Sequence, residues 1–179
     1  MRLGATYLLL LSLLLTPVRG QAQTPPPTEQ QIKAAFIFNF AKFVEWPSSV
    51  FSNAATPLVI GVLGENPFGT VLEQTVRNKA INDRTLEVKE FHHQAEVTNC
   101  HILFISTSEK KRLPEILGAL RREGVLTVSE MDGFIEAGGM INFVKESNKI
   151  RFQINEPAAK KSKLKVSSKL LSLAVPLAP

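Results

Sequence analysis

Cysteine is almost absent from this sequence, since Cys100 is the only one among 179 residues. A lone cysteine excludes any disulfide within the chain, so the fold cannot depend on disulfide cross-links. Cys100 precedes the apolar run 102–105, which is typical of a strand, and we interpret it as a buried, inert thiol. A bridge to another chain would require the thiol to be exposed.

Histidine is also scarce, and His92, His93 and His101 are the only three. Together with Cys100 they form the one cluster of residue types that bind metals. Neighbouring residues of a strand point to opposite faces of a sheet, so these side chains converge only if a loop rearranges. We therefore expect no metal site, and nothing in the sequence calls for a cofactor.

Motifs of catalysis and of nucleotide binding are missing as well. There is no G-x-S-x-G elbow, and the glycine-rich segment 61–69 has neither the end of a P-loop nor the G-x-G-x-x-G spacing. Glu130, Asp132 and Glu136 offer paired carboxylates without an accompanying nucleophile or base. The sequence thus indicates a binding protein rather than an enzyme. A hydrolase would require a nucleophile–base pair in one cleft.

The excess of positive charge comes from the two ends of the chain. Without Arg2 and Arg19 in the N-terminal segment, 19 basic residues face 16 acidic ones. Five of the basic residues lie in one C-terminal stretch, and the remainder has a slight acidic excess, which excludes a broad nucleic-acid-binding face. We interpret that stretch as a solvated helix face, with contact to anionic lipid headgroups as the alternative. Its members are Lys160, Lys161, Lys163, Lys165 and Lys169.

The N-terminal segment carries the three parts of a secretory signal peptide. Arg2 precedes an apolar run over residues 7–15, and small residues follow at Gly20 and Ala22. The run is shorter than the roughly 20 apolar residues of a membrane span. We predict a signal peptide over residues 1–22 and export to the periplasm. Cleavage follows Ala22 or, alternatively, Gly20, and an uncleaved anchor is the other interpretation.

Cleavage after Ala22 leaves 157 residues, the length of one domain that buries a sizeable core. We interpret residues 23–28, with three consecutive prolines, as a linker, 29–174 as a single α/β domain and 175–179 as a tail.

Apolar patterning predicts alternating helices and strands within that domain. A helix over 29–45 must end before Pro47, and Phe36, Ile37, Phe40, Phe43 and Val44 share its apolar face. Strands are expected at 58–63, 85–91, 101–105 and 124–128, a hairpin at 140–143 and 150–154, and one helical turn at 131–136. A further helix is expected at 68–77. Another follows a capping box at 106–109, with a kink or a new start at Pro114. A C-terminal helix is expected at 156–173, with Asn155 as its N-cap. The order predicts a three-layer α/β/α sandwich around a mainly parallel sheet, with an antiparallel hairpin at one edge.

Seven segments of the chain, taken in order, resemble a known family over about residues 29–174. They are 33–47 (KAAFIFNFAKFVEWP), 60–69 (IGVLGENPFG), 100–106 (CHILFIS), 125–134 (VLTVSEMDGF), 138–141 (GGMI), 152–155 (FQIN) and 164–174 (LKVSSKLLSLA). Their order and spacing resemble the YfiR family of periplasmic proteins. The resemblance implies a small regulator that represses a membrane-bound diguanylate cyclase by binding its periplasmic sensor domain, and so limits cyclic di-GMP and biofilm formation. Some relatives use disulfides for stability or redox sensing, which a single cysteine rules out within this chain.

Two groups of residues are candidates for binding. In α/β proteins ligands lie beyond the carboxyl ends of the strands, where the expected loops carry groups suited to a small anion or amide. A partner protein instead needs aromatic anchors, for which Phe38 and Trp46 are candidates, with core packing as the alternative for both. The loop candidates are Gly64, Glu65, Asn66, Ser106, Ser108, Ser129 and Asp132.

Our leading hypothesis from the sequence is a regulatory protein that binds the periplasmic domain of an inner-membrane signalling protein, a diguanylate cyclase or a sensor kinase, in its inactive state. The alternative is a periplasmic small-molecule sensor or carrier without a cyclase partner. The sequence leaves a homodimer open.

Overall fold

The structure is a computed structural model that describes residues 25–120 and 124–177. The predicted signal peptide lies outside the described residues, as do the first two residues of the predicted linker. Within the described part, no helix has both the length and the apolar character needed to cross a membrane.

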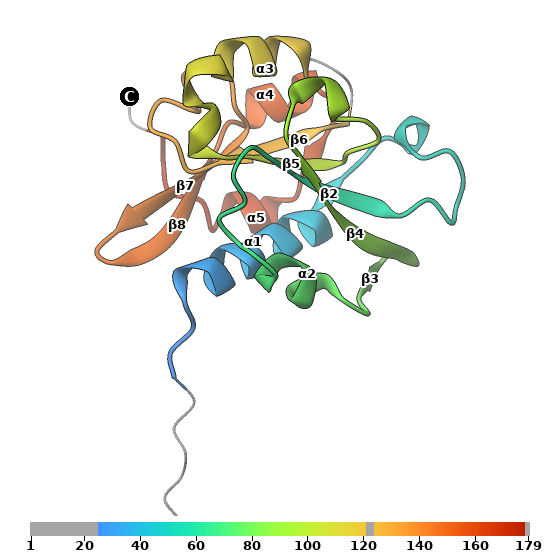
Figure 1. Cartoon of the computed structure of the whole chain (residues 1–179), viewed down its shortest axis with the longest axis horizontal. Coiled ribbons are helices and arrows are strands. Elements are labelled where there is room, and N and C mark those ends of the chain that lie inside the picture. The colour runs from blue at the N-terminus through green and yellow to red at the C-terminus, as the bar shows by residue number, and fades with distance from the viewer. Residues whose placement is uncertain (1–24, 121–123, 178–179) are drawn as a thin grey trace, which may run out of the picture.

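A seven-stranded sheet forms the centre of the domain, in the order β3-β4-β2-β5-β6-β7-β8 (Figure 1). The five strands from β4 to β7 in this order are parallel, while β3 and β8 pair antiparallel at the two edges. This confirms the predicted mainly parallel sheet with an antiparallel hairpin at one edge. The strands are β2 (Leu58–Leu63), β3 (Ala80–Ile81), β4 (Arg84–Phe91), β5 (Ile102–Ile105), β6 (Leu126–Ser129), β7 (Ile141–Glu146) and β8 (Lys149–Ile154).

Helices cover both faces of the sheet, as a sandwich requires. Figure 1 shows α3 (Leu113–Ala119) above the sheet, and α1 (Glu29–Phe43) and α2 (Val71–Val76) below it. Alternate residues of the central strands contribute to two hydrophobic cores, one on each face of the sheet. Ile102 and Phe104 of β5 join the core under α1, whereas Leu103 and Ile105 join the core under α3. Such strands, buried on both faces, explain the continuous apolar runs of the sequence.

Helix α1 begins with a complete capping box between Thr28 and Gln31. Ile37 and Phe40 on its inner face are fully buried, and Phe40 packs against Phe143 and Phe152 of the hairpin. The predicted end at residue 45 is wrong, because Val44 and Glu45 leave the helix and form strand β1.

Two other helices are also shorter than predicted. Residues 68–70 do not belong to α2, because the Asn66 side chain accepts the Phe68 N–H at 2.8 Å and holds this segment as a turn. Thr107–Arg112 forms a 3₁₀ helix, and α3 starts afresh with Pro114 in its first turn. The predicted capping box at 106–109 does not form, because Ser106 Oγ accepts the N–H of Ser108 and the Glu109 side chain binds Arg112. Two further 3₁₀ helices, Ser48–Val50 and Gln94–Glu96, lie in connections.

The predicted C-terminal helix over 156–173 is wrong as a continuous element. It divides into α4 (Glu156–Lys161), β9 (Lys165–Val166) and α5 (Ser168–Leu171). Lys163 adopts a left-handed conformation with φ 58°, which ends the helical path, and β9 then pairs with β1 (Val44–Glu45). Asn155 is the N-cap of α4, as predicted, with its side chain accepting the Ala158 N–H at 3.1 Å. The segment after Met131 forms consecutive turns rather than a regular helix.

Candidate functional site

The loops that follow β2 and β5 meet at the carboxyl edge of the sheet. The Glu65 N–H donates to Ser108 Oγ at 3.0 Å. Gly64 makes this approach feasible: its φ is 87°, and a Cβ there would lie 2.4 Å from Ser108 Oγ. The structure therefore brings Gly64, Glu65, Ser106 and Ser108 together.

Most polar groups of these loops are engaged with each other or with the backbone. Ser129, which is fully buried, donates to the carbonyl of Ile105 at 2.7 Å and accepts the Met131 N–H at 3.3 Å. Asn66 Nδ2 donates to Glu90 at 2.6 Å. These side chains hold the strand-end turns in shape, and their hydrogen bonds give each a structural role.

Asp132 lies apart from that cluster and lines a hollow of about 340 Å³ between α1, the loop after β6 and β7. Glu29 and Lys33 of α1, Glu130 and Lys145 line the same hollow. Three carboxylates and two ammonium groups thus line the hollow. The hollow is the place where charged side chains from distant parts of the chain converge.

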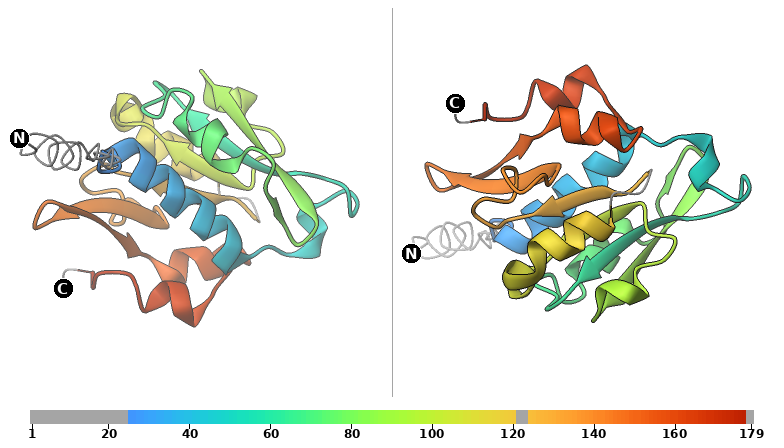
Figure 2. Two further views of the ribbon diagram at one scale, coloured as in Figure 1. Left: turned by 90° about the horizontal axis from the view of Figure 1, so that it is seen from below. Right: turned by 90° about the horizontal axis from the view of Figure 1, so that it is seen from above.

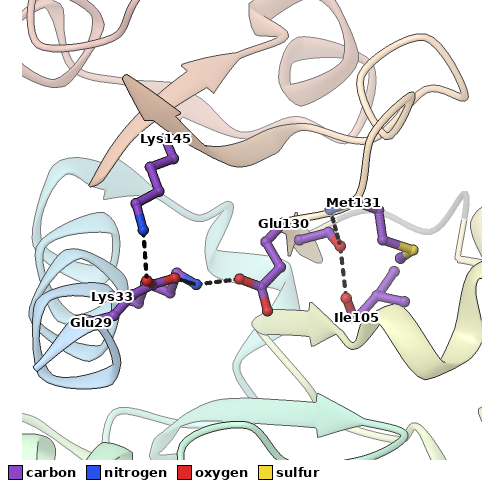
Figure 3. Close-up of polar contacts among 7 residues, drawn as sticks. Glu29, Lys33, Ile105, Glu130, Met131 and Lys145 are labelled. Carbon is purple, nitrogen blue, oxygen red and sulfur yellow. Dashed lines mark hydrogen bonds and ion pairs between the residues drawn. The ribbon is translucent and has the colours of Figure 1, made fainter. Parts of the chain in front are cut away.

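Lys33 is the centre of this group (Figure 3). Its Nζ lies 2.5 Å from Glu29 Oε1 and is hydrogen-bonded to Glu130. Lys145 Nζ lies 3.7 Å from the other oxygen of Glu29. Only 10% of the Lys33 side chain is exposed, so this is a nearly buried ammonium with two carboxylate partners. The network connects the first turn of α1 with the end of β6 and the hairpin.

The ion pairs change the acidity of these groups. Burial alone would lower the pKa of Lys33, but the hydrogen bonds to Glu130 and Glu29 and the negative charges of these two carboxylates together outweigh it and raise that pKa. The hydrogen bond from Lys33 and its charge lower the pKa of Glu29. Both groups are therefore charged at neutral pH.

Sequence reasoning missed Lys33, although a signal for it exists. Lys33 precedes Ile37 by four positions and Phe40 by seven, so it lies on the buried face of α1. A lysine on an apolar helix face needs a partner, and Glu29 is one turn earlier. Its second partner, Glu130, is 97 positions later, which only the fold reveals.

The two predicted aromatic anchors have different environments. Trp46 is half-buried, and its indole N–H donates to the carbonyl of His101 at 3.2 Å. Phe38 is also half-buried, with Lys79 Nζ 4.4 Å and Lys42 Nζ 5.8 Å from its ring centre. Both rings contact the core from its margin.

Cys100 and His101 are both buried, at the amino end of β5. Burial raises the pKa of the Cys100 thiol to about 12. His101 Nδ1 accepts the Val59 N–H at 3.0 Å, and its ring stacks on Phe51 at 4.6 Å. Burial lowers the pKa of His101. Among residues 25–120 and 124–177, no group of three or more His, Cys, Asp or Glu side chains is placed to hold a metal ion.

Comparison with known proteins agrees with this fold. A conserved domain protein from Vibrio cholerae O1 biovar El Tor has a crystal structure that superposes with a TM-score of 0.55 at 10% sequence identity. The match covers 83% of this chain and 60% of that one, and at this identity it shows the fold alone. No curated protein sequence matched the chain.

The sequence profile of one family, described as YfiR/HmsC-like, matches residues 30–175, which is nearly the whole domain. This is a family of periplasmic regulatory proteins, and its members regulate membrane signalling proteins. The chain therefore belongs to the YfiR/HmsC-like family.

Proposed function

We propose that this protein is a periplasmic regulator that binds the periplasmic domain of an inner-membrane signalling protein, a diguanylate cyclase or a sensor kinase, and keeps it inactive. The family match over residues 30–175 carries the proposal. A binding protein inhibits such a partner when its affinity for the inactive state exceeds its affinity for the active state. For a cyclase partner, the result is less cyclic di-GMP and less biofilm.

In this role the polar groups at the strand ends are structural. The hydroxyl groups of Ser106, Ser108 and Ser129 have backbone partners. His101 precedes β5 and Ser106 follows it, so these two residues lie at opposite ends of the strand. The structure thus offers no nucleophile–base pair between them.

For the protein contact we propose the surface around Trp46. Its indole is fixed by the hydrogen bond to His101, and the residue as a whole is only half-buried. A ring that is already ordered loses little conformational entropy on binding, which favours it as an anchor. Trp46→Phe keeps the aromatic packing but removes the hydrogen bond, and it should weaken partner binding less than Trp46→Ala.

The proposal is tested by affinity purification from detergent-solubilised membranes, with the mature chain as bait. We expect recovery of a membrane protein with a diguanylate cyclase or kinase domain, and we expect deletion of the gene to raise cyclic di-GMP if the partner is a cyclase. Recovery of neither partner, together with unchanged cyclic di-GMP, would falsify the proposal. Sequencing of the periplasmic protein should show a mature N-terminus at Gln23, as cleavage after Ala22 requires.

The hollow around Lys33 favours one alternative, a small-molecule sensor without a cyclase partner. A volume of about 340 Å³ with charges of both signs suits a small zwitterion. Thermal-shift screening of amino acids and nucleotides tests this function. A stabilising compound that fails to stabilise Asp132→Asn would locate the site in the hollow, whereas a screen without hits rejects the alternative.

A further inference from the structure

A row of alternating cations and aromatic rings crosses the outer layer of helices. Figure 2 shows α1 running across this face between α2 and α5. Lys42 Nζ lies 5.8 Å from the ring centres of both Phe38 and Phe43, all on α1. Lys79, which follows α2, lies 4.4 Å from the Phe38 ring, and Lys169 of α5 lies 5.2 Å from the Phe43 ring. We call Lys79, Phe38, Lys42, Phe43 and Lys169 the lysine–phenylalanine row.

Few carboxylates lie on the helices that carry this row. After Glu29, helix α1 contains no acidic residue, and α5 contains none. Helix α2 adds Glu73 alone. None of the three lysines of the row forms an ion pair with another residue of the described segments. The layer therefore presents three available ammonium groups beside two half-buried phenyl rings.

We infer that the lysine–phenylalanine row is a contact surface for anionic phospholipid headgroups. Lysines attract an anionic membrane surface, and aromatic rings next to lysines are suited to the depth of the headgroups. The rings are half-buried and do not project, so the contact is with headgroups and not with the acyl chains. The charge of the row matches such a surface without a shaped cleft. This inference goes beyond regulation of a partner, and it assigns Phe38 to lipid rather than to protein.

Such a contact would have a clear consequence for regulation. Weak attraction to the membrane would keep the protein in the plane where an inner-membrane partner is found. The row would face the bilayer, and the surface of the sheet opposite α1 would face away from it.

The test is binding of the mature chain to vesicles at low ionic strength. Vesicles of phosphatidylethanolamine with phosphatidylglycerol should bind the protein, whereas phosphatidylcholine vesicles should not. Because each lysine near an anionic surface contributes about 1 kcal/mol, K42Q/K79Q/K169Q should lower the partition coefficient on the order of 100-fold. Added salt should abolish binding of the wild type.

A matched control separates the row from overall charge. K110Q/K111Q/K149Q removes the same charge from three exposed lysines outside the row, and it should bind the anionic vesicles nearly as the wild type does. Thermal melting checks that both variants fold. Absence of wild-type binding, or equal loss in both variants, overturns the inference. Loss of partner binding with unchanged vesicle binding in K42Q/K79Q/K169Q would overturn it too, and would identify the row as a protein interface.

Discussion

Lys33, on the buried face of α1, is ion-paired with Glu130, which follows the last residue of β6. The two residues are 97 positions apart, and their contact fastens the first helix of the domain to the carboxyl edge of the sheet. Glu29 completes the group from the solvent side, where 42% of its side chain is exposed. A nearly buried charge with two partners is costly to leave unpaired.

Replacement of Lys33 by methionine should destabilise the domain. Methionine fills a similar volume but leaves Glu130 without its cation in a site where 23% of that side chain is exposed. We expect a loss of about 2 kcal/mol in the free energy of unfolding, since breaking a fully buried pair costs roughly 3–5 kcal/mol and this pair is partly solvated. Urea unfolding measures the change.

The double variant K33M/E130Q is the control for this interpretation. Glutamine is neutral, so the double variant lacks the unpaired carboxylate and should recover part of the lost stability. If K33M were as stable as the wild type, Lys33 would not be the centre of a stabilising network.

The stability of the domain should also depend on the ionisation of His101. Its ordinary pKa is 6.5, and burial, opposed only in part by a backbone hydrogen bond, lowers that pKa in the folded state. The unfolded chain therefore takes up a proton first as the pH falls. The stabilising contribution is complete above pH 6.5 and declines below it, until the lower pKa of the folded state is passed.

Unfolding free energies measured at several pH values around 6.5 test this prediction. His101→Asn is the matched control, because its amide oxygen can accept the Val59 N–H in place of Nδ1 and does not titrate. The wild type should lose more stability than this variant on acidification through this range. Parallel pH profiles for the two proteins would show that His101 does not supply the dependence.

The strands were more predictable than the last part of the chain, for physical reasons. A strand buried on both faces has a continuous apolar run, and Leu58–Leu63 shows it in the sequence and in the structure. The left-handed conformation of Lys163 has no such signal, since glycine or asparagine is usual at that position. After Lys163, the long-range pairing of β9 with β1 determines where the C-terminal segment lies.

The same contrast holds for the candidate site. The loops after parallel strands predict a meeting point of polar groups, and Ser108 does contact Glu65. Periodicity also places Lys33 on the inner face of α1. No local sequence pattern predicts that Lys33 and Glu130 lie close together, because their contact depends on the packing of α1 against the sheet. The sequence therefore indicated the edge of the sheet and two residues of the charged hollow, Glu130 and Asp132, but not their convergence with Lys33.

Cys100 should be unreactive in the native protein. The side chain is buried, burial raises the pKa of its thiol to about 12, and its Sγ donates to the Ile102 carbonyl at 2.9 Å. Thiolate is the reactive form, so labelling by a thiol reagent should be on the order of 100-fold slower than for an exposed cysteine. Labelling in urea, where the thiol is accessible, gives the reference rate. Rapid labelling without denaturant would contradict the structure and would reopen an intermolecular disulfide.

Gly61 and Gly118 should respond in opposite directions to alanine. Gly61 lies in the middle of β2, where a Cβ would be 2.7 Å from the Phe91 ring and 2.8 Å from Cys100 Sγ. Packing at this density does not admit a methyl group without displacement of its neighbours, so Gly61→Ala should cost about 1–3 kcal/mol. Gly118, in α3, has no atom within 4 Å of the same position. Because alanine favours a helix over glycine, Gly118→Ala should stabilise the protein by about 0.5–1 kcal/mol. Thermal unfolding of the two variants compares the same chemical change at a closed and at an open position. Equal shifts of the melting temperature would mean that β2 is not packed as closely against β4 and β5 as the structure shows.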